Sequence, residues 1–319
     1  MNHVAQTTRG SIEYRTVGQG PTLLVLNGGH TNCDSPLGHE QFFLDQGYHL
    51  LIPSRPGYGK TPSSTGRTAE AFADALVSLL DLLHLDSVIV VGISAAGRTA
   101  LQLAGRAPSR VSKLILQNAV TGGRFPTGLT RVMAYLLFNP FIEAGTWAAF
   151  RAFARVAPRA AFRGMMASLT CLDPNQVIAT MSRDQQQAAL AFLLTSRSGS
   201  GFLHDIHHQC GDLRRITTPT LILESKYDGS KDPCHATYAA DQIANAELFL
   251  SPAESHLFWF SSYDREIRAK CKRSCNPERE AIFPDVFSGF RRFFPVVGTG
   301  HTCPASSGLC LESQWACAG

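Results

Sequence analysis

Three residues of this chain, Ser94, Asp228 and His256, are of the types that together perform nucleophilic catalysis. A serine hydroxyl is a weak nucleophile until an imidazole takes its proton, and a carboxylate fixes the tautomer of that imidazole and stabilises its positive charge. Each of the three follows a short apolar run of the kind that forms a buried strand. We therefore predict that Ser94 is a nucleophile, His256 its base and Asp228 the acid that orients the base.

The residues around Ser94 predict a tight turn between a strand and a helix. An apolar, β-branched run (88–91) stops at a glycine before Ser94, and the stretch after the turn (98–104) has helical composition. A nucleophile on such a turn needs small neighbours, and the helix N-terminus beneath it supplies partial positive charge. The ideal pattern is Gly-x-Ser-x-Gly, whereas here Ala96 takes the second glycine position and Gly97 follows it. Alone, this pentapeptide fits an ordinary turn equally well.

The order of the three residues adds to the prediction. Asp228 follows the apolar run 220–225, and His256 follows the run 247–251. Serine, then acid, then histidine is the chain order of the α/β-hydrolase triad, distinct from the chymotrypsin-like and subtilisin-like orders. Asp232 is the rival acid, but Lys-Asp-Pro is typical of the start of a helix, where aspartate is a natural cap.

An earlier apolar run, residues 22–26, ends in Asn-Gly-Gly-His. With this loop and the segments above, the chain resembles the α/β-hydrolase superfamily with a helical lid, over roughly residues 10–294. The resemblance implies that the backbone N–H groups of Gly29 and Ala95 form an oxyanion hole, where glycine allows the backbone to approach the substrate oxygen closely. It also implies a serine mechanism that needs no cofactor and no metal ion.

Other residues near these segments are candidates for substrate contact or for support. His30 and Asn32 adjoin the oxyanion loop, and Trp259 adjoins the base. We predict that these three contact substrate, although each could instead brace its loop or pack the core. The loop around Ser54 resembles the Asp-x-Pro-Gly-x-Gly-x-Ser loop of the superfamily, with serine in place of the usual aspartate, at a loop-bracing position. We expect Arg98, on the helix after the nucleophile, to be structural.

Strand and helix patterns alternate along most of the chain. The predicted strands are residues 11–17 (an edge strand), 22–26, 48–52, 88–91, 111–117, 220–225 and 247–251, and the predicted helices are 40–46, 68–84, 98–106 and 285–294. This alternation predicts an α/β fold, with a mostly parallel central sheet and helices on both faces, as in the α/β hydrolases. We expect a core of residues 1–120 and 212–294, a helical lid of residues 121–211 and a disordered tail of residues 295–319, which lacks an apolar stripe. A charged stretch, residues 264–273, has no counterpart in the resemblance.

Residues 121–215 contain ten arginines, no lysine and five acidic residues. Such a surplus could favour anionic substrates or a membrane surface, or simply mark a solvated helical face. The same segment contains His204, His207 and His208, but their spacing matches no tetrahedral zinc pattern, and we expect solvated lid histidines.

Composition limits the setting of the protein. No run of about 18 apolar residues is present, so we expect no membrane span. The first residues lack the apolar core of a signal peptide, which predicts a cytoplasmic protein, and in that setting the nine cysteines are expected to be free thiols. We expect a small-molecule substrate and no nucleic-acid partner; the oligomeric state stays open.

The sequence thus predicts a serine hydrolase that cleaves a small or medium-sized apolar ester or lactone through an acyl-enzyme. The same residues also serve carbon–carbon bond hydrolases and perhydrolases, and a slow-turnover ligand receptor or pseudoenzyme keeps them too. Epoxide and haloalkane hydrolases resemble this fold but have aspartate at the position of Ser94.

Overall fold

The sheet of this protein is ordered so that the ends of its parallel strands meet at one edge. The computed structural model describes residues 2–36 and 38–275. Its eight-stranded sheet has the order β1-β2-β4-β3-β5-β6-β7-β8. The strands are β1 Asn2–Thr7, β2 Gly10–Val17, β3 Thr22–Leu26, β4 His49–Pro53, β5 Val88–Ile93, β6 Val111–Gln117, β7 Thr220–Ser225 and β8 Ala246–Ser251. Pairing is antiparallel from β1 to β2 and from β2 to β4, and parallel elsewhere. The predicted fold class is confirmed.

Residues 11–17 were predicted to form an edge strand, which is wrong. Strand β1 lies outside β2 and is the true edge. Most side chains of β1 are exposed. Its sequence therefore lacks the alternation of apolar and polar residues that predicts a strand. The strands β3 and β7, in contrast, are buried along their whole length, as strands covered on both faces must be.

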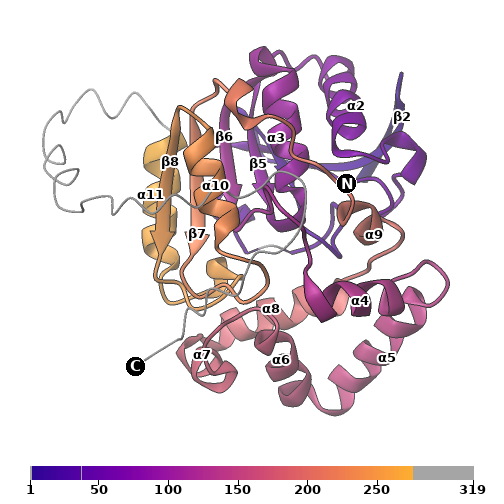
Figure 1. The fold of residues 1–319 in the computed structure, drawn as a ribbon, viewed down its shortest axis with the longest axis vertical. Helices are drawn as coiled ribbons and strands as arrows, with labels where there is room; N and C mark the ends of the chain where they lie inside the picture. The colour runs from indigo at the N-terminus through magenta and orange to yellow at the C-terminus, as the bar shows by residue number, and fades with distance from the viewer. Residues whose placement is uncertain (1, 37, 276–319) are drawn as a thin grey trace, which may run out of the picture.

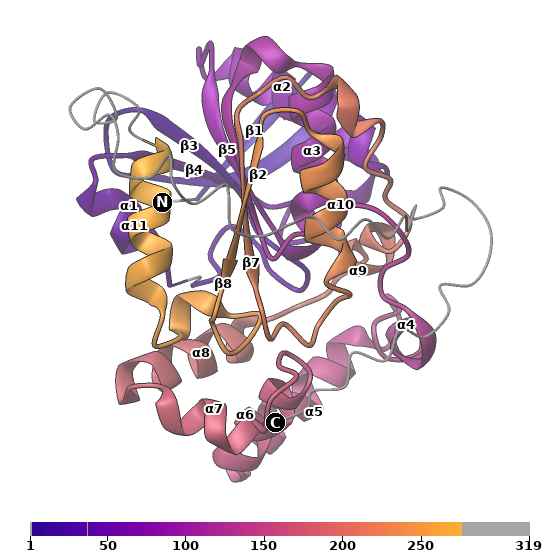
Figure 2. The ribbon, with the colours of Figure 1, turned by 60° about the vertical axis from the view of Figure 1, so that its left-hand side comes forward.

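Helices cover both faces of the sheet (Figures 1 and 2). One face carries α2 Ala69–Leu82, α3 Gly97–Arg106 and α10 Cys234–Gln242, and the other carries α1 Glu40–Asp45 and α11 Asp264–Cys275. Helix α2 starts where Thr68 caps it, since the threonine side chain accepts a hydrogen bond from the Ala71 amide.

The charged stretch 264–273 lies within α11, which buries Ile267 and Cys271 against the sheet. The exposed face of α11 is charged, and its charged residues outnumber the buried apolar ones, so the sequence reads as a polar stretch. The predicted helix 285–294 and the predicted tail 295–319 lie outside the described residues. None of the helices in the described ranges is long and apolar enough to cross a membrane.

Residues 121–211, called the helical insert below, lie across the edge where the parallel strands end (Figure 1). The insert contains α4 Gly128–Leu137, α5 Glu143–Val156, α6 Pro158–Ala167, α7 Pro174–Thr180, α8 Arg183–Thr195 and α9 Gly201–Asp205. Pro158 begins α6, because proline fits the first turn of a helix but interrupts a helix interior. An isolated bridge between Thr170 and Asp228 joins the insert to the loop after β7.

Candidate active site

Ser94 stands on a strained turn between β5 and α3. Its φ is +51°, a left-handed value that costs energy for any residue other than glycine, and a 3₁₀ turn over Ser94–Ala96 leads into the helix. The turn brings neighbouring segments very close: a Cβ on Gly92 would lie 2.5 Å from Ala100 Cβ, and one on Gly97 would lie 2.6 Å from a backbone oxygen. Ala96 fits with its methyl group buried in the core. Close approach is therefore needed at Gly97, one position beyond the ideal pattern.

Asp228 and His256 meet at the ends of β7 and β8. His256 Nδ1 lies 2.7 Å from Asp228 Oδ2. The hydroxyl of Ser230 donates to Asp228 Oδ1 at 2.7 Å and lies 2.8 Å from the same histidine nitrogen. Burial alone would raise the pKa of Asp228, but the His256 ring, Lys231 and the Ser230 hydroxyl outweigh it and hold the pKa below its ordinary value. The carboxylate is thus kept charged against the imidazole.

A buried ion pair lies behind this carboxylate. Lys231 pairs with Glu224 on β7, and its Nζ lies 3.8 Å from Asp228 Oδ2. Burial raises the pKa of Glu224 to about 7, despite the lysine beside it. The side chain of the rival acid Asp232 makes a different contact: its Oδ1 accepts a hydrogen bond from the Cys234 amide at the start of α10.

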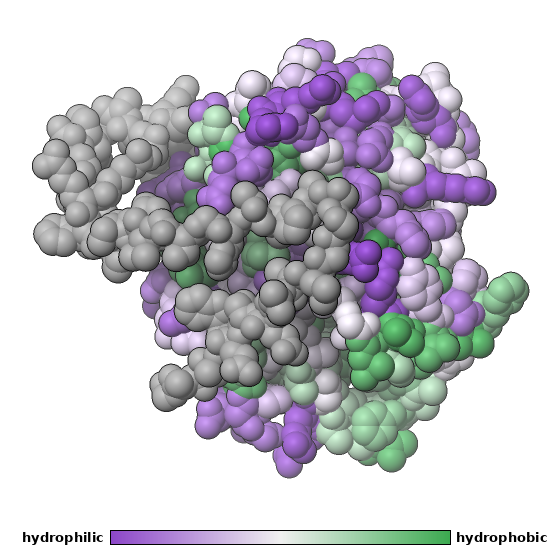
Figure 3. Space-filling view, viewed as in Figure 1, coloured by the Kyte–Doolittle hydropathy of each residue, from purple (hydrophilic) through white to green (hydrophobic). Residues whose placement is uncertain are grey.

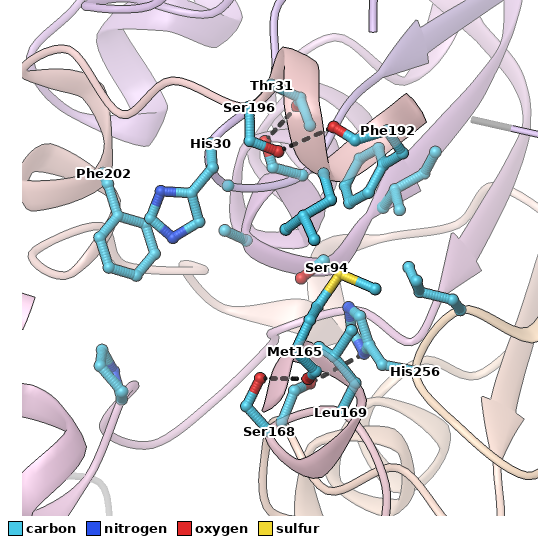
Figure 4. A pocket seen from close by; sticks show the side chains of 18 of the residues that line it. His30, Thr31, Ser94, Met165, Ser168, Leu169, Phe192, Ser196, Phe202 and His256 are labelled. Carbon is cyan, nitrogen blue, oxygen red and sulfur yellow. Dashed lines mark hydrogen bonds between the residues drawn. The ribbon is translucent and has the colours of Figure 1, made fainter. Parts of the chain in front are cut away.

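Ser94 and His256 line one cavity of about 550 Å³ (Figure 4). Both residues are described, and no hydrogen bond joins them in this ligand-free geometry, as is common before substrate binds. Side chains of the helical insert complete the cavity, among them Met165, Leu169 and Phe192. The lining is mostly aliphatic and aromatic, and none of its residues is an arginine, lysine, aspartate or glutamate.

The loop after β3 lines this cavity with Gly28 and Gly29. The Gly28 carbonyl accepts hydrogen bonds from Arg55 Nη2 at 2.8 Å and from Thr31 Oγ1 at 2.7 Å. Because a trans peptide carries its C=O and N–H on opposite sides, the Gly29 N–H points away from Arg55. A Cβ on Gly28 would lie 3.0 Å from Ser94 Cβ, so this peptide is packed against the serine. Ala95 is the second residue of the 3₁₀ turn, where a backbone N–H has no partner within the helix.

His30 lines the cavity as a neutral ring. Its Nδ1 lies 2.8 Å from the Ser198 hydroxyl, which also accepts a hydrogen bond from Trp147 Nε1 at 2.7 Å. The indole can only donate, so the Ser198 hydroxyl is an acceptor toward Trp147, while the direction of its bond with His30 Nδ1 follows the tautomer of the ring. Burial lowers the pKa of His30 to about 4. The ring centroid lies 4.0 Å from that of Phe202.

The other two predicted substrate contacts, Asn32 and Trp259, differ in whether they line the cavity. Asn32 is not among the cavity-lining residues; its Oδ1 accepts a hydrogen bond from the Asp34 amide, and its backbone oxygen accepts one from Asn27. Asn32 therefore braces its loop. Trp259 lines the cavity and also packs in the core, where its Nε1 donates to Gln117 Oε1 at 2.9 Å.

Sequence reasoning missed a buried ion pair beneath the oxyanion loop. Arg55 pairs with Asp205 at the end of α9, and its Nε donates to the Asn27 carbonyl at 2.7 Å. Tyr58 donates to Asp205 Oδ2 at 2.6 Å. Burial alone would raise the pKa of Asp205, but Arg55 lowers it below its ordinary value. No local signal links Arg55 to Asp205, because the two lie far apart in the sequence.

The structure also bears on the expected roles of the histidines near Asp205, of Arg98 and of Ser54. The histidines near Asp205 were expected to be solvated, which is wrong for His208: it is buried, since α9 packs against the core. Among the described residues, no group of three His, Cys, Asp or Glu side chains is arranged to hold a metal ion. Arg98 is buried and donates to the Gly123 carbonyl at 2.6 Å, a structural role. Ser54 braces its loop by donating to Glu13 Oε2 at 2.8 Å.

Asn118 is another residue that the sequence did not single out. It has a φ of +43° at the end of β6, its Oδ1 accepts from the Ser225 amide at 2.7 Å, and its Nδ2 donates to the His256 carbonyl at 2.7 Å. Asn118 therefore joins β6, β7 and the loop that carries the histidine.

Comparison with known proteins agrees with this geometry. The family described as the alpha/beta hydrolase fold matches residues 21–262. The chain is 35% identical to the uncharacterized hydrolase YcgS of Bacillus subtilis (strain 168), over 78% of this chain and 89% of that protein. It is 30% identical to a 2-hydroxy-6-oxononadienedioate/2-hydroxy-6-oxononatrienedioate hydrolase of Burkholderia vietnamiensis, over 45% of this chain and 54% of that protein.

Two further similarities extend over most of the chain. A pimeloyl-[acyl-carrier protein] methyl ester esterase of Nitrosospira multiformis is 25% identical over 81% of this chain and 95% of that protein. Among solved structures, an alpha/beta hydrolase fold protein from Nakamurella multipartita has a TM-score of 0.73 and 26% identity, covering 85% of this chain and 97% of its own. With the family match over residues 21–262 and YcgS similar along most of its length, the chain belongs to the α/β-hydrolase fold family.

Proposed function

We propose that this protein is a serine hydrolase that cleaves a neutral, apolar carboxylic ester or lactone through an acyl-enzyme. The observation that carries the proposal is the pairing of His256 Nδ1 with Asp228 Oδ2 at 2.7 Å, at the cavity that Ser94 also lines with its strained backbone. These are the parts that an activated serine requires.

In the proposed mechanism, Ser94 Oγ attacks the ester carbonyl while His256 Nε2 takes the hydroxyl proton. Asp228 holds Nδ1–H and stabilises the imidazolium, and the N–H groups of Gly29 and Ala95 donate to the oxyanion. His256 then gives its proton to the leaving alcohol, and water hydrolyses the acyl-enzyme by the same route in reverse. Loss of one oxyanion donor typically costs about 2.7–4 kcal/mol of transition-state stabilisation.

The lining of the cavity supports a neutral substrate. Among the described residues no arginine or lysine lines it, and His30 is kept uncharged by burial. A carboxylate inside the cavity would lose its hydration without gaining a charged partner, which is costly. An uncharged acyl chain, in contrast, gains from burial against the aliphatic and aromatic side chains.

A carbon–carbon bond hydrolase is the second candidate, because relatives are named for such substrates as 2-hydroxy-6-oxononadienedioate. That compound is a dicarboxylate, and the cavity offers its two charges no cationic side chain. A slow-turnover receptor differs from both candidates in releasing little or no product.

The test is labelling with a fluorophosphonate probe, followed by turnover of esters of increasing acyl length. We expect the native protein to label and the Ser94→Ala variant not to label, while Asp232→Ala labels normally. Neutral esters should be turned over repeatedly, and dicarboxylate substrates should be poor. Labelling of Ser94→Ala would overturn the nucleophile; stoichiometric acylation without turnover would favour the receptor.

A further inference from the structure

Helices α4 and α5 expose an unusual amount of apolar surface. Of the 14 large hydrophobic residues exposed among those described, ten lie between residues 129 and 156. We call this set the α4–α5 surface: Leu129, Val132, Met133, Tyr135, Leu136, Leu137, Phe141, Ile142, Phe153 and Val156. Figure 3 shows the corresponding apolar region gathered at the lower right, where Figure 1 places α4 and α5. A contiguous apolar patch of this kind marks an interaction site.

The most exposed members of the surface have exposed fractions far above those of packed side chains. Phe141 is 96% exposed, Val156 87% and Leu129 75%. Phe141 lies in the turn between the two helices, so the hairpin presents an aromatic ring at its tip. An aromatic and aliphatic tip of this kind suits insertion into an apolar layer.

The charge of the same stretch has one sign. Residues 121–172 contain six arginines, no lysine, and Glu143 as their single acidic residue. Glu143 is buried and pairs with Arg197, so it offers no free negative charge to a partner. Arg124, Arg155 and Arg159 are exposed. The stretch that carries the apolar face thus also carries exposed arginines. An apolar and a cationic character together complement a surface that is apolar inside and negative outside, which is the chemistry of an anionic lipid layer.

This surface is continuous with the cavity of the site. Met133 and Leu137 of α4 are exposed and also line the cavity. On α5, Trp147 lines the cavity, while Phe153 and Val156 of the same helix face outward. Helices α4 and α5 therefore line the cavity with one face and expose the other face to a binding partner.

We propose that the α4–α5 surface docks on an anionic lipid layer, with the apolar hairpin at its acyl boundary and the arginines against its headgroups. The inference concerns binding and does not depend on the proposed reaction. A docked protein would receive apolar acyl compounds from the lipid side, where such compounds concentrate.

The test is co-sedimentation of the full chain with vesicles of phosphatidylcholine alone or with added phosphatidylglycerol. We expect binding to the anionic vesicles, weakening as salt rises, and little binding to the neutral ones. Phe141→Asp and Leu129→Asp should each weaken binding by about tenfold or more, because they place a charge in the apolar layer. Arg155→Gln should weaken it by about fivefold.

Leu82→Asp is the matched control, since Leu82 is 49% exposed on α2 and the change in charge is the same. Leu82→Asp and Ser94→Ala should bind as the native protein does; for Ser94→Ala this holds whether or not Ser94 is the nucleophile. Thermal melts should show all variants folded.

Equal binding of Phe141→Asp and the native protein would overturn the proposal. So would a native dimer, seen by light scattering, that Phe141→Asp splits in the absence of lipid, which would assign the surface to a second copy. A melting temperature that Phe141→Asp lowers by several degrees, with no vesicle binding by the native protein, would assign it to residues 276–319.

Discussion

At the scale of single residues, the two candidate acids differ in hydrogen bonds that only the structure reveals. Asp228 and Asp232 lie four positions apart and are equal candidates by residue type. Asp228 bonds the imidazole and Ser230, whereas Asp232 accepts a hydrogen bond from the Cys234 amide at the start of α10. A carboxylate that bonds a backbone amide at a helix start is already occupied, so the two aspartates make a matched pair for experiment.

Ser94→Ala and His256→Ala should each lower kcat/KM for a neutral ester by about 10⁴-fold or more, and the double variant should be little worse, because such groups act as a unit. Asp228→Ala should lower it by at least about 10³-fold. Asp232→Ala should retain most of the activity. Steady-state kinetics check all four, and near-total loss in Asp232→Ala with an active Asp228→Ala would move the acid to Asp232.

The sequence could point to Ser94, Asp228 and His256 because each follows a buried strand whose apolar run is visible locally. It could not point to Ser230, whose position depends on how the loop after β7 folds back on the aspartate. Asn32 shows the reverse error: its nearness to the oxyanion loop in sequence suggested substrate contact, but its side chain bonds within its own loop. Adjacency along the chain does not tell which side of a loop faces the cavity.

At the scale of elements, the buried pair of Arg55 and Asp205 joins the loop after β4 to helix α9. Both side chains are 2% exposed, so each charge depends on the other. Asp205→Asn would leave the Arg55 guanidinium buried beside a neutral amide, and Tyr58 would lose its carboxylate acceptor.

We expect Asp205→Asn to lower the free energy of unfolding by about 3–5 kcal/mol, the usual cost of breaking a buried ion pair from one side. Urea unfolding measures this loss. Asp212→Asn, an exposed acid paired with Arg214, is the control and should leave the midpoint unchanged. A change of less than about 1 kcal/mol in Asp205→Asn would contradict a structural role for the pair.

Elements with long apolar runs were predictable, and those without were not. The strands Thr22–Leu26, Val111–Gln117 and Thr220–Ser225 have the predicted bounds, because each contains a run of buried apolar residues that is visible in the sequence. Strand β1 is exposed along most of its length, and α11 hides two buried residues among charged ones, so neither leaves a clear pattern. The arginines at four-residue spacing from 151 to 163 suggested contact with anionic substrates, but none of them lines the cavity.

At the scale of the whole molecule, burial keeps the rings of His30 and His235 in their neutral form. Burial lowers the pKa of His30 to about 4 and that of His235 to about 3. In the unfolded chain each has its ordinary value of 6.5, so below that pH the unfolded state binds protons that the folded state does not. The stability associated with each histidine is therefore full above about pH 6.5 and is lost as the pH falls toward its folded pKa.

The expected loss is about 1.4 kcal/mol per pH unit for each histidine, between about pH 6 and the folded pKa. Urea unfolding over a pH series measures the slope. His235→Gln retains an acceptor for the Thr121 amide and should remove about one histidine's share of that slope. His3→Gln, an exposed histidine on β1, should leave the slope as it is. Parallel slopes for the native protein and His235→Gln would show that His235 is protonated in the fold.

Arginines of the core bond both ends of the helical insert. Arg98 on α3 bonds the Gly123 carbonyl where the insert leaves the sheet, and Arg55 bonds Asp205 where it returns. Arg55 also bonds the Gly28 carbonyl beside Ser94. We expect that the helices between these two anchors can be exchanged for others while Ser94, His256 and the loop after β3 keep their places. An exchange that removed Asp205 should instead disturb the loop beside Ser94, because Arg55 would lose its buried partner.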